Sequence, residues 1–209
     1  MKTITEALTW RYATQQFDTT KKISETDIMT LLDAARLSPS WYGLQPWKFI
    51  LVENPETRAM LREASYGQPK VTEASHLIVF AHTTTLDEKY VDSYIKSTAT
   101  IREITPEDLK GLKDGIMGLV NMIGQNPAVW AANQTHIALG VMIGAASTMK
   151  IDSAPYGGFD PVKYDEILGL QELGLHAIVA CAVGYRLDND PAAAKAKSRF
   201  SLEEVILRK

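Results

Sequence analysis

Two short basic clusters near opposite ends of the chain carry the residue types best suited to hold an anion. The first lies within Arg11 to Phe17, and the second lies within Lys195 to Phe200. Fixed Arg and Lys donors with hydroxyl groups between them suit a phosphate, because their charge-assisted hydrogen bonds match its oxygens. Both clusters fall at the edges of periodic segments, where folds usually place ligand-binding residues. The pattern predicts a phosphate site built from both ends of the chain.

A loop at residues 38–47, with the sequence Ser-Pro-Ser-Trp-Tyr-Gly-Leu-Gln-Pro-Trp, is the third candidate. No Gly-rich strand–helix turn accompanies these segments, which excludes a Rossmann or P-loop site. The four histidines share no metal-ligand spacing, so we predict no metal site. Cys181 lies inside an apolar strand and is expected to be an inert core residue. Hydrolase and metalloenzyme functions therefore have little support.

The elements that must position these segments form a mixed pattern of helices and strands. Side chains suited to helix N-caps occur at Thr3, Ser24, Asn54 and Asp160. The spacing predicts helices over residues 3–11, 24–38, 86–100, 105–122, 126–149 and 160–169, and another from residue 54. It predicts strands over residues 47–52, 76–81, 151–154 and 176–184, the second of them buried on both faces. We expect one domain over residues 1–209.

The helix expected over residues 126–149 is apolar on nearly every face from Ile137, which predicts burial on all sides. Gly140 and Gly144 lie four residues apart and would let another backbone come close. Two interpretations explain this stripe: close packing inside one subunit, or a helix–helix interface between two subunits. The periodicity of the sequence does not distinguish between these interpretations.

Composition limits the partners of the protein. The net charge of −3 argues against nucleic acid, whose phosphates call for basic surfaces. The longest apolar stretch, Ile137 to Ala146, is too short to span a bilayer, so we predict no membrane association. The N-terminal residues lack the apolar core of a signal peptide, and the single cysteine fits a reducing compartment. A cytoplasmic location is expected.

Five motifs, in this order, resemble those of the nitroreductase family over nearly the whole chain. They are Arg11 to Phe17, Ser38-Pro39-Ser40 with Gln45-Pro46-Trp47, Glu73 to His76, Pro155 to Asp160, and Lys197-Ser198-Arg199. The resemblance implies an α+β nitroreductase fold, with a central, mainly antiparallel sheet flanked by helices. It also implies a homodimer that exchanges its C-terminal arms and binds FMN at the subunit interface.

The resemblance assigns roles to individual residues. The implied cofactor-binding residues are Arg11, Tyr12, Ala13, Gln15, Pro39, Ser40, Trp41, Gly43, Gln68, Pro155, Tyr156, Gly157, Gly158, Lys197 and Arg199. The implied substrate-side residues are Trp41, Tyr42, Lys70 and Leu119. Arg11 and Arg199 would bind the FMN phosphate with Lys197 beside them, and Pro39, Ser40 and Gly43 would come from the neighbouring subunit. No catalytic side chain is implied, because the flavin carries the chemistry.

The chain departs from the family pattern at several of these positions. Ala13 replaces a usual Ser, and neutral Gln15 replaces a usual Lys or Arg that faces N1 and O2 of the flavin. Trp41 and Tyr42 replace small polar residues, and they would contact either the substrate or the second subunit.

The implied activity is reduction of nitroaromatics, quinones or related acceptors with NAD(P)H as the electron donor. A protein that stores or senses FMN without turnover is the alternative, and Gln15 is the residue that favours it. The physiological acceptor and the choice between NADH and NADPH stay open at this point.

Overall fold

The computed structural model describes residues 3–124 and 126–209, which fold around a four-stranded sheet. The strands are β1 (Trp47–Val52), β2 (His76–Thr83), β3 (Asp152–Tyr156) and β4 (Leu175–Gly184). Their order in the sheet is β1-β2-β4-β3, and all three pairings are antiparallel. The predicted α+β class with a mainly antiparallel sheet is confirmed.

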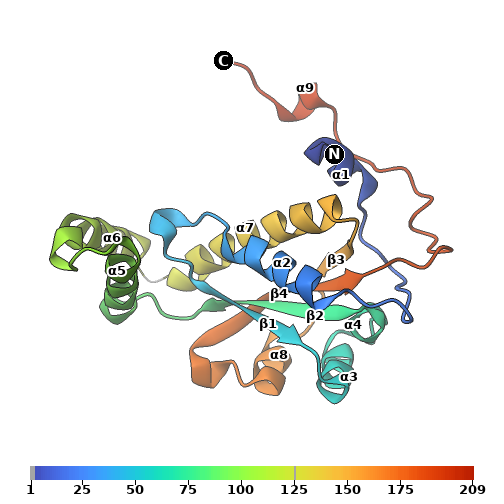
Figure 1. Cartoon of the computed structure of the whole chain (residues 1–209), viewed down its shortest axis with the longest axis horizontal. Coiled ribbons are helices and arrows are strands. Elements are labelled where there is room, and N and C mark those ends of the chain that lie inside the picture. Colours follow the sequence, from blue (N-terminus) through green and yellow to red (C-terminus); the bar gives the residue numbers. More distant parts are fainter. Residues whose placement is uncertain (1–2, 125) are drawn as a thin grey trace.

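Two layers of helices cover the sheet (Figure 1). On one face lie α2 (Glu25–Arg36) and α7 (Pro127–Thr148); on the other lie α3 (Pro55–Ala64), α4 (Lys70–Glu73) and α8 (Pro161–Leu168). β2 is buried on both faces, as predicted. Leu77 and Val79 join the core beneath α3 and α8, while Ile78 and Phe80 join the core beneath α2 and α7. This alternation follows from the two-residue period of a strand.

A third, smaller core lies beyond one end of the sheet. There α5 (Glu88–Arg102) and α6 (Lys110–Ile123) pack together against the beginning of α7. At the opposite side of the molecule α1 (Ile4–Trp10) packs against α7, and the C-terminal arm, which carries α9 (Leu202–Val205), stands out from the body (Figure 1). Short 3-10 turns η1 (Trp41–Gly43), η2 (Glu107–Leu109) and η3 (Gln171–Leu173) complete the chain.

Most helix starts agree with the capping residues read from the sequence. The side chains of Thr3, Ser24, Asn54 and Asp160 each accept a backbone N–H of the first turn. α5 begins two residues later than expected because Asp87 caps it, accepting the Tyr90 N–H at 2.8 Å. The helix expected from residue 105 is divided, since η2 precedes α6. Local spacing does not distinguish a 3-10 turn from a first α-helical turn.

The long helix α7 differs from its prediction. Its side chains Ile137 and Val141 are 41% and 39% exposed, so one stripe of the helix is not covered within the chain. A Cβ added at Gly140 would meet no atom within 4 Å, and one at Gly144 would meet only Ile4 of α1, at 3.9 Å. The glycine stripe therefore lies against open space for part of its length. Close packing inside the subunit does not account for it.

Candidate functional site

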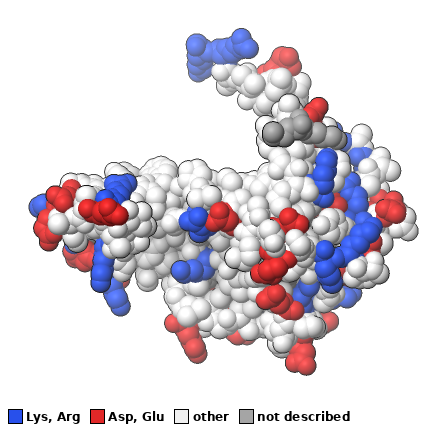
Figure 2. Space-filling model, viewed as in Figure 1, with Lys and Arg blue, Asp and Glu red and all other residues white. Residues whose placement is uncertain are grey.

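The two basic clusters predicted from opposite ends of the sequence come together in one chain. The Lys197 ammonium donates to the carbonyls of Leu8, at 2.9 Å, and of Arg11. Arg11 Nη2 reaches the Ser153 carbonyl of β3 at 3.5 Å. The first and last segments of the chain run close together at this side of the molecule (Figure 1), where Figure 2 shows a gathering of Lys and Arg side chains. The structure thus joins what the sequence separates by almost its full length.

Electrostatics at this cluster favour an anion. Burial lowers the pKa of Arg11, and the nearby charge of Arg199 lowers it further. Burial also lowers the pKa of Lys197, together with the charges of Arg11 and Arg199. Within the part of the chain that the structure describes, none of these three cations forms an ion pair with a carboxylate. An anion placed among them would relieve this mutual repulsion.

An unsatisfied polar atom points to the same conclusion. Arg11 Nε is buried and has no hydrogen-bond partner among the described atoms. Buried donors are normally paired, so an unpaired one within a cationic cluster calls for an acceptor from outside the chain. A phosphate has oxygens that fit this donor and the neighbouring ammonium and guanidinium groups. The residues present therefore fit the phosphate end of a flavin mononucleotide.

The turn that follows β3 lies next to this cluster. Ala13 forms an isolated parallel bridge with Ser153, which joins the first basic segment to the start of β3. Pro155 and Tyr156 end the strand, and its edge position tolerates a proline without an N–H. After the strand, the Gly158 carbonyl accepts the side-chain amide of Gln68 at 2.7 Å. This contact brings the Gly157-Gly158 turn together with Gln68, which is also among the residues predicted to bind the cofactor.

Lys70 also belongs to this group by position. Its ammonium lies 5.0 Å from the ring centroid of Tyr156, and burial lowers its pKa. Lys70 is predicted to lie on the substrate side, and the structure places it next to Tyr156, at the end of β3. Its position at the start of the short helix α4, which the sequence did not reveal, is the reason.

Two of the side chains predicted to bind the cofactor form hydrogen bonds within the chain. The Tyr12 hydroxyl donates to Asp190 at 3.0 Å, and burial together with this bond raises the pKa of Tyr12 to about 12. The Gln15 amide donates to the Ala13 carbonyl at 2.8 Å. The Tyr12 hydroxyl and the Gln15 amide N–H are thus paired within the chain.

The loop at residues 38–45 is held at a different place, between α5, α6 and α7. The Trp41 N–H donates to the Gln134 side chain at 3.1 Å, and the Trp41 ring stands edge-on to Trp130 with a centroid distance of 6.5 Å. Leu119 is buried in the adjacent core. Trp41 and Tyr42 themselves are 52% and 47% exposed. The loop therefore presents aromatic surface to the outside.

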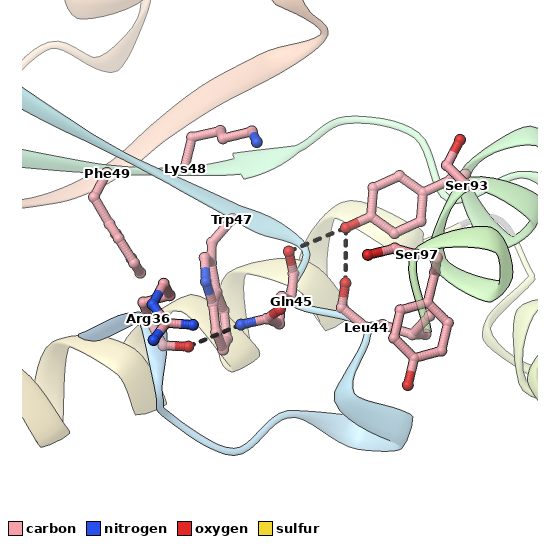
Figure 3. Close-up of a pocket in the computed structure, with 10 residues that line it drawn as sticks. Arg36, Leu44, Gln45, Trp47, Lys48, Phe49, Ser93 and Ser97 are labelled. Carbon is pink, nitrogen blue, oxygen red and sulfur yellow. Dashed lines mark hydrogen bonds between the residues drawn. The ribbon is translucent and has the colours of Figure 1, made fainter. Parts of the chain in front are cut away.

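The backbone of this loop is strained and fastened. Tyr42, Gly43 and Gln45 have φ values of 54°, 73° and 50°, in the left-handed region that non-glycine residues rarely adopt. The Tyr94 hydroxyl donates to the Tyr42 carbonyl. The Tyr90 hydroxyl donates to the Leu44 and Gln45 carbonyls, and dashed lines in Figure 3 mark these two bonds. Such strain persists only where surrounding contacts hold it. Two tyrosines of α5 supply those contacts.

A cavity of about 460 Å³ lies beneath this loop. It is lined by Arg36, Leu44, Gln45, Trp47, Lys48, Phe49, Tyr90, Ser93, Tyr94 and Ser97. Figure 3 shows the Trp47 and Phe49 side chains extending toward the Arg36 guanidinium, while Lys48 extends away from them. None of the residues assigned to the cofactor or substrate from the sequence lines this cavity.

One chain does not bring the two groups of predicted site residues together. The loop lies at the end of the body where α5 and α6 pack, and the basic cluster lies at the side that carries α1 and the arm (Figure 1). Pro39, Ser40, Trp41 and Gly43 therefore stand apart from Arg11 and the turn after β3. A binding site that uses both groups needs a second chain.

The described residues hold neither a candidate metal centre nor a helix able to span a membrane. Groups of three or more His, Cys, Asp or Glu that could hold a metal ion are absent from residues 3–124 and 126–209. Over the same residues, every helix is too short or too polar to cross a membrane. Cys181 is fully buried, and burial raises the pKa of its thiol to about 12.

Comparison with known proteins places this fold and site in a family. A sequence model of the nitroreductase family matches residues 8–185. YfkO of Bacillus subtilis, whose name describes a candidate NAD(P)H nitroreductase, is 37% identical over 218 residues, covering 97% of this chain and 96% of its own. The chain belongs to the nitroreductase family, as the five motifs predicted.

Solved structures agree on the fold. YdfN of Bacillus subtilis, described as a candidate nitroreductase, has a TM-score of 0.86 at 16% identity, with 98% of each chain covered. A candidate nitroreductase from Exiguobacterium sibiricum, crystallised in complex with FMN, has a TM-score of 0.81 at 21% identity, covering 100% of this chain and 98% of its own. The predicted nitroreductase fold is confirmed.

Proposed function

We propose that this protein is an FMN-dependent NAD(P)H oxidoreductase that reduces nitroaromatics, quinones or related acceptors. The observation that carries the proposal is the convergence of Arg11, Lys197 and Arg199 beside β3 without a carboxylate partner among the described residues. The names of the relatives and the FMN complex of a structural neighbour support the same cofactor and donor.

Different residues of the chain hold the two ends of the cofactor. Arg11, Lys197 and Arg199 bind the phosphate, and the turn from Pro155 to Gly158, supported by Gln68, lies along the ring system. Glycine at this turn lets backbone N–H groups approach the flavin closely. When bound, FMN supplies the hydride chemistry between NAD(P)H and the acceptor, so no side chain needs to act as a general base. We expect ping-pong kinetics from successive use of one site.

A homodimer is part of the proposal. In one chain the loop at residues 38–45 lies away from the basic cluster, and a second subunit would bring its own loop to that cluster. Pro39, Ser40 and Gly43 of the second subunit would then complete the site, with Trp41 and Tyr42 near the acceptor. An apolar groove of about 600 Å³, which includes Ile137 and the Gly140–Gly144 stripe, supports this assembly. The C-terminal arm also supports a homodimer. Its apolar side chains Phe200 and Leu207 are 78% and 84% exposed, and apolar surface of this kind is typical of a protein–protein contact.

The proposal also covers organisation and location. We propose that residues 1–209 form one FMN-binding domain and that the protein works in the cytoplasm, where a single unpaired cysteine is chemically stable.

Two measurements test the function. The purified protein is expected to be a yellow dimer with one FMN per subunit, measured by light scattering and absorbance. A monomer that stays colourless after incubation with FMN would contradict the proposal. Steady-state oxidation of NADH and NADPH with menadione or nitrofurazone then separates an enzyme from an FMN store or sensor. A protein that holds FMN but shows no turnover with any acceptor would favour the store or sensor, as the neutral Gln15 does.

A further inference from the structure

A stacked arrangement of side chains lies directly beside Arg11 and has no role in the function proposed so far. The Arg186 guanidinium is held between two aromatic rings, with its central carbon 4.3 Å from the Trp10 ring centroid and 4.5 Å from the Tyr12 ring centroid. Lys150 adds a second cation over the Trp10 ring, at 4.2 Å. Arg11 is the residue between the two rings in the sequence.

The backbone explains why Arg11 takes a separate direction. Arg11 ends α1 with φ −72° and ψ 147°, an extended conformation. In extended backbone the side chains on either side of a residue share one face, and the residue between them points to the other. Trp10 and Tyr12 both contact Arg186, whereas the Arg11 guanidinium contacts β3 at Ser153. The direction of Arg11 is thus coupled to the stack.

A buried carboxylate fixes the centre of the stack. Asp152 is 4% exposed. Its Oδ1 accepts Arg186 Nε at 2.8 Å and lies 2.5 Å from Arg186 Nη2, and its Oδ2 accepts the Arg186 backbone N–H at 2.9 Å. One buried carboxylate thus holds both the guanidinium and the backbone of Arg186, by charge-assisted hydrogen bonds. Asp152 begins β3, so the stack is anchored to the sheet.

A second buried carboxylate holds the segment that follows. Asp190 accepts the Tyr12 hydroxyl at 3.0 Å and the backbone N–H groups of Gln15 and Gln16 at 2.9 Å and 3.3 Å. Asp152 and Asp190 therefore bind groups other than Arg11, Lys197 and Arg199. Both carboxylates fix the segment. Burial has the larger effect on Arg11 and lowers its pKa, while the charge of Asp152 acts against burial and raises that pKa.

We propose that Arg186, held by Asp152 between Trp10 and Tyr12, is a positioning residue that directs Arg11 toward the phosphate of the flavin. The inference rests on the proposed function and deepens it. It predicts that Arg186 affects only the part of flavin affinity that depends on the phosphate, although its own guanidinium is engaged by Asp152.

The test compares FMN with riboflavin, which lacks the phosphate, by fluorescence titration of the apoprotein. Arg186→Met should weaken FMN roughly three- to tenfold, a part of the roughly ten- to hundredfold loss expected when Arg11 itself is removed. Riboflavin affinity should change less than about twofold. Arg36→Met is the matched control, because Arg36 is an exposed arginine paired with Asp33 on α2, and it should change neither affinity.

A double-mutant cycle separates positioning from a general structural effect. Once Arg11→Ala has removed the directed group, adding Arg186→Met should cause little further loss of FMN affinity. Losses that multiply in the double variant, or equal losses for FMN and riboflavin, would overturn the inference. If Arg186→Met does not fold by circular dichroism, Asp152→Asn and Arg186→Lys test the same coupling with smaller changes. Wild-type protein that binds FMN no better than riboflavin would instead contradict the proposed function.

Discussion

The basic cluster beside β3 and the loop at residues 38–45 satisfy their polar groups in opposite ways. The cluster leaves a buried donor, Arg11 Nε, without a partner and keeps three cations together. The loop has its strained backbone fastened by the hydroxyls of Tyr90 and Tyr94. A region with unpaired polar groups is stabilised when a ligand pairs with them. A region whose polar groups are already paired within the chain instead keeps a fixed shape. Under the proposed function, the cluster would supply affinity for the phosphate, and the loop would give the second subunit's part of the site a fixed shape.

Removing a cation from the cluster tests its side of this comparison most strongly. Arg11→Ala or Arg199→Ala should weaken FMN roughly ten- to hundredfold, because a hydrogen bond to a charged group contributes about 1.5–3 kcal/mol. Riboflavin should lose much less, and isothermal titration with both flavins measures the difference. Equal losses for the two flavins would show that these side chains do not contact the phosphate.

The loop should respond in stability and not in phosphate affinity. Gly43 has φ 73°, and a Cβ there would lie 3.1 Å from the Tyr94 hydroxyl oxygen. Gly43→Ala should lower the free energy of unfolding by about 1–2 kcal/mol, because alanine is strained in the left-handed conformation. The close contact with Tyr94 should lower it further. Gly67→Ala is the control, since Gly67 has φ 75° but nothing within 4 Å of an added Cβ.

Urea unfolding of both variants measures the two contributions. A loss at Gly43 no greater than at Gly67 would mean that the loop can move away from Tyr94. The preference of the protein for FMN over riboflavin should stay unchanged in both.

A smaller change removes one fastening of the loop. Tyr94→Phe deletes the hydroxyl that donates to the Tyr42 carbonyl, which should cost about 0.5–1.5 kcal/mol of stability. The KM for aromatic acceptors should change, while the preference for FMN over riboflavin should not. Tyr66→Phe is the control, because Tyr66 is 77% exposed. If Tyr94→Phe behaves like this control in unfolding and in KM, the loop does not depend on that bond.

The smallest expected effect lies at the neutral position in the first basic segment. Reduced flavin carries negative charge near N1 and O2, which a cation at Gln15 would stabilise. A unit charge at ~4 Å with an effective dielectric of ~20 sets an upper limit of about 4 kcal/mol. For a two-electron couple, ~30 mV corresponds to about 1.4 kcal/mol. After screening by solvent, Gln15→Lys should therefore raise the reduction potential of the bound FMN by about a few tens of millivolts. Potentiometric titration measures it, and an unchanged or lower potential would mean that this side chain does not face N1.

Features set by neighbouring residues were predictable from the sequence. The caps at Thr3 and Asn54 act within one helical turn, and the alternation in β2 follows from strand geometry, so both were confirmed. The caps and the alternation need no knowledge of how distant segments pack. The segments that carry the two basic motifs come together in the structure, and their binding of FMN stays a prediction.

Features that join distant residues were not predictable in this way. Asp152 and Arg186 are 34 positions apart, and Tyr94 and Tyr42 are 52 apart, so no local spacing announces either contact. The four-residue helix α4, which carries Lys70 to the turn after β3, is too short to leave a periodic pattern. The exposure of one stripe of α7 likewise depends on what packs against the helix, not on the residues of the stripe itself.

The place of Lys197 on the C-terminal arm has a thermodynamic consequence. Lys197 reaches the Leu8 and Arg11 carbonyls only when the arm lies along α1, and Arg199 is two residues further along the same arm. The apparent dissociation constant of FMN then equals the intrinsic constant divided by the fraction of molecules whose arm is docked. Reciprocally, a bound phosphate favours the docked arm by the same factor. Flavin loading and order at the end of the chain are thus two measurements of one equilibrium, and protease sensitivity after Asp190 should fall as FMN is added.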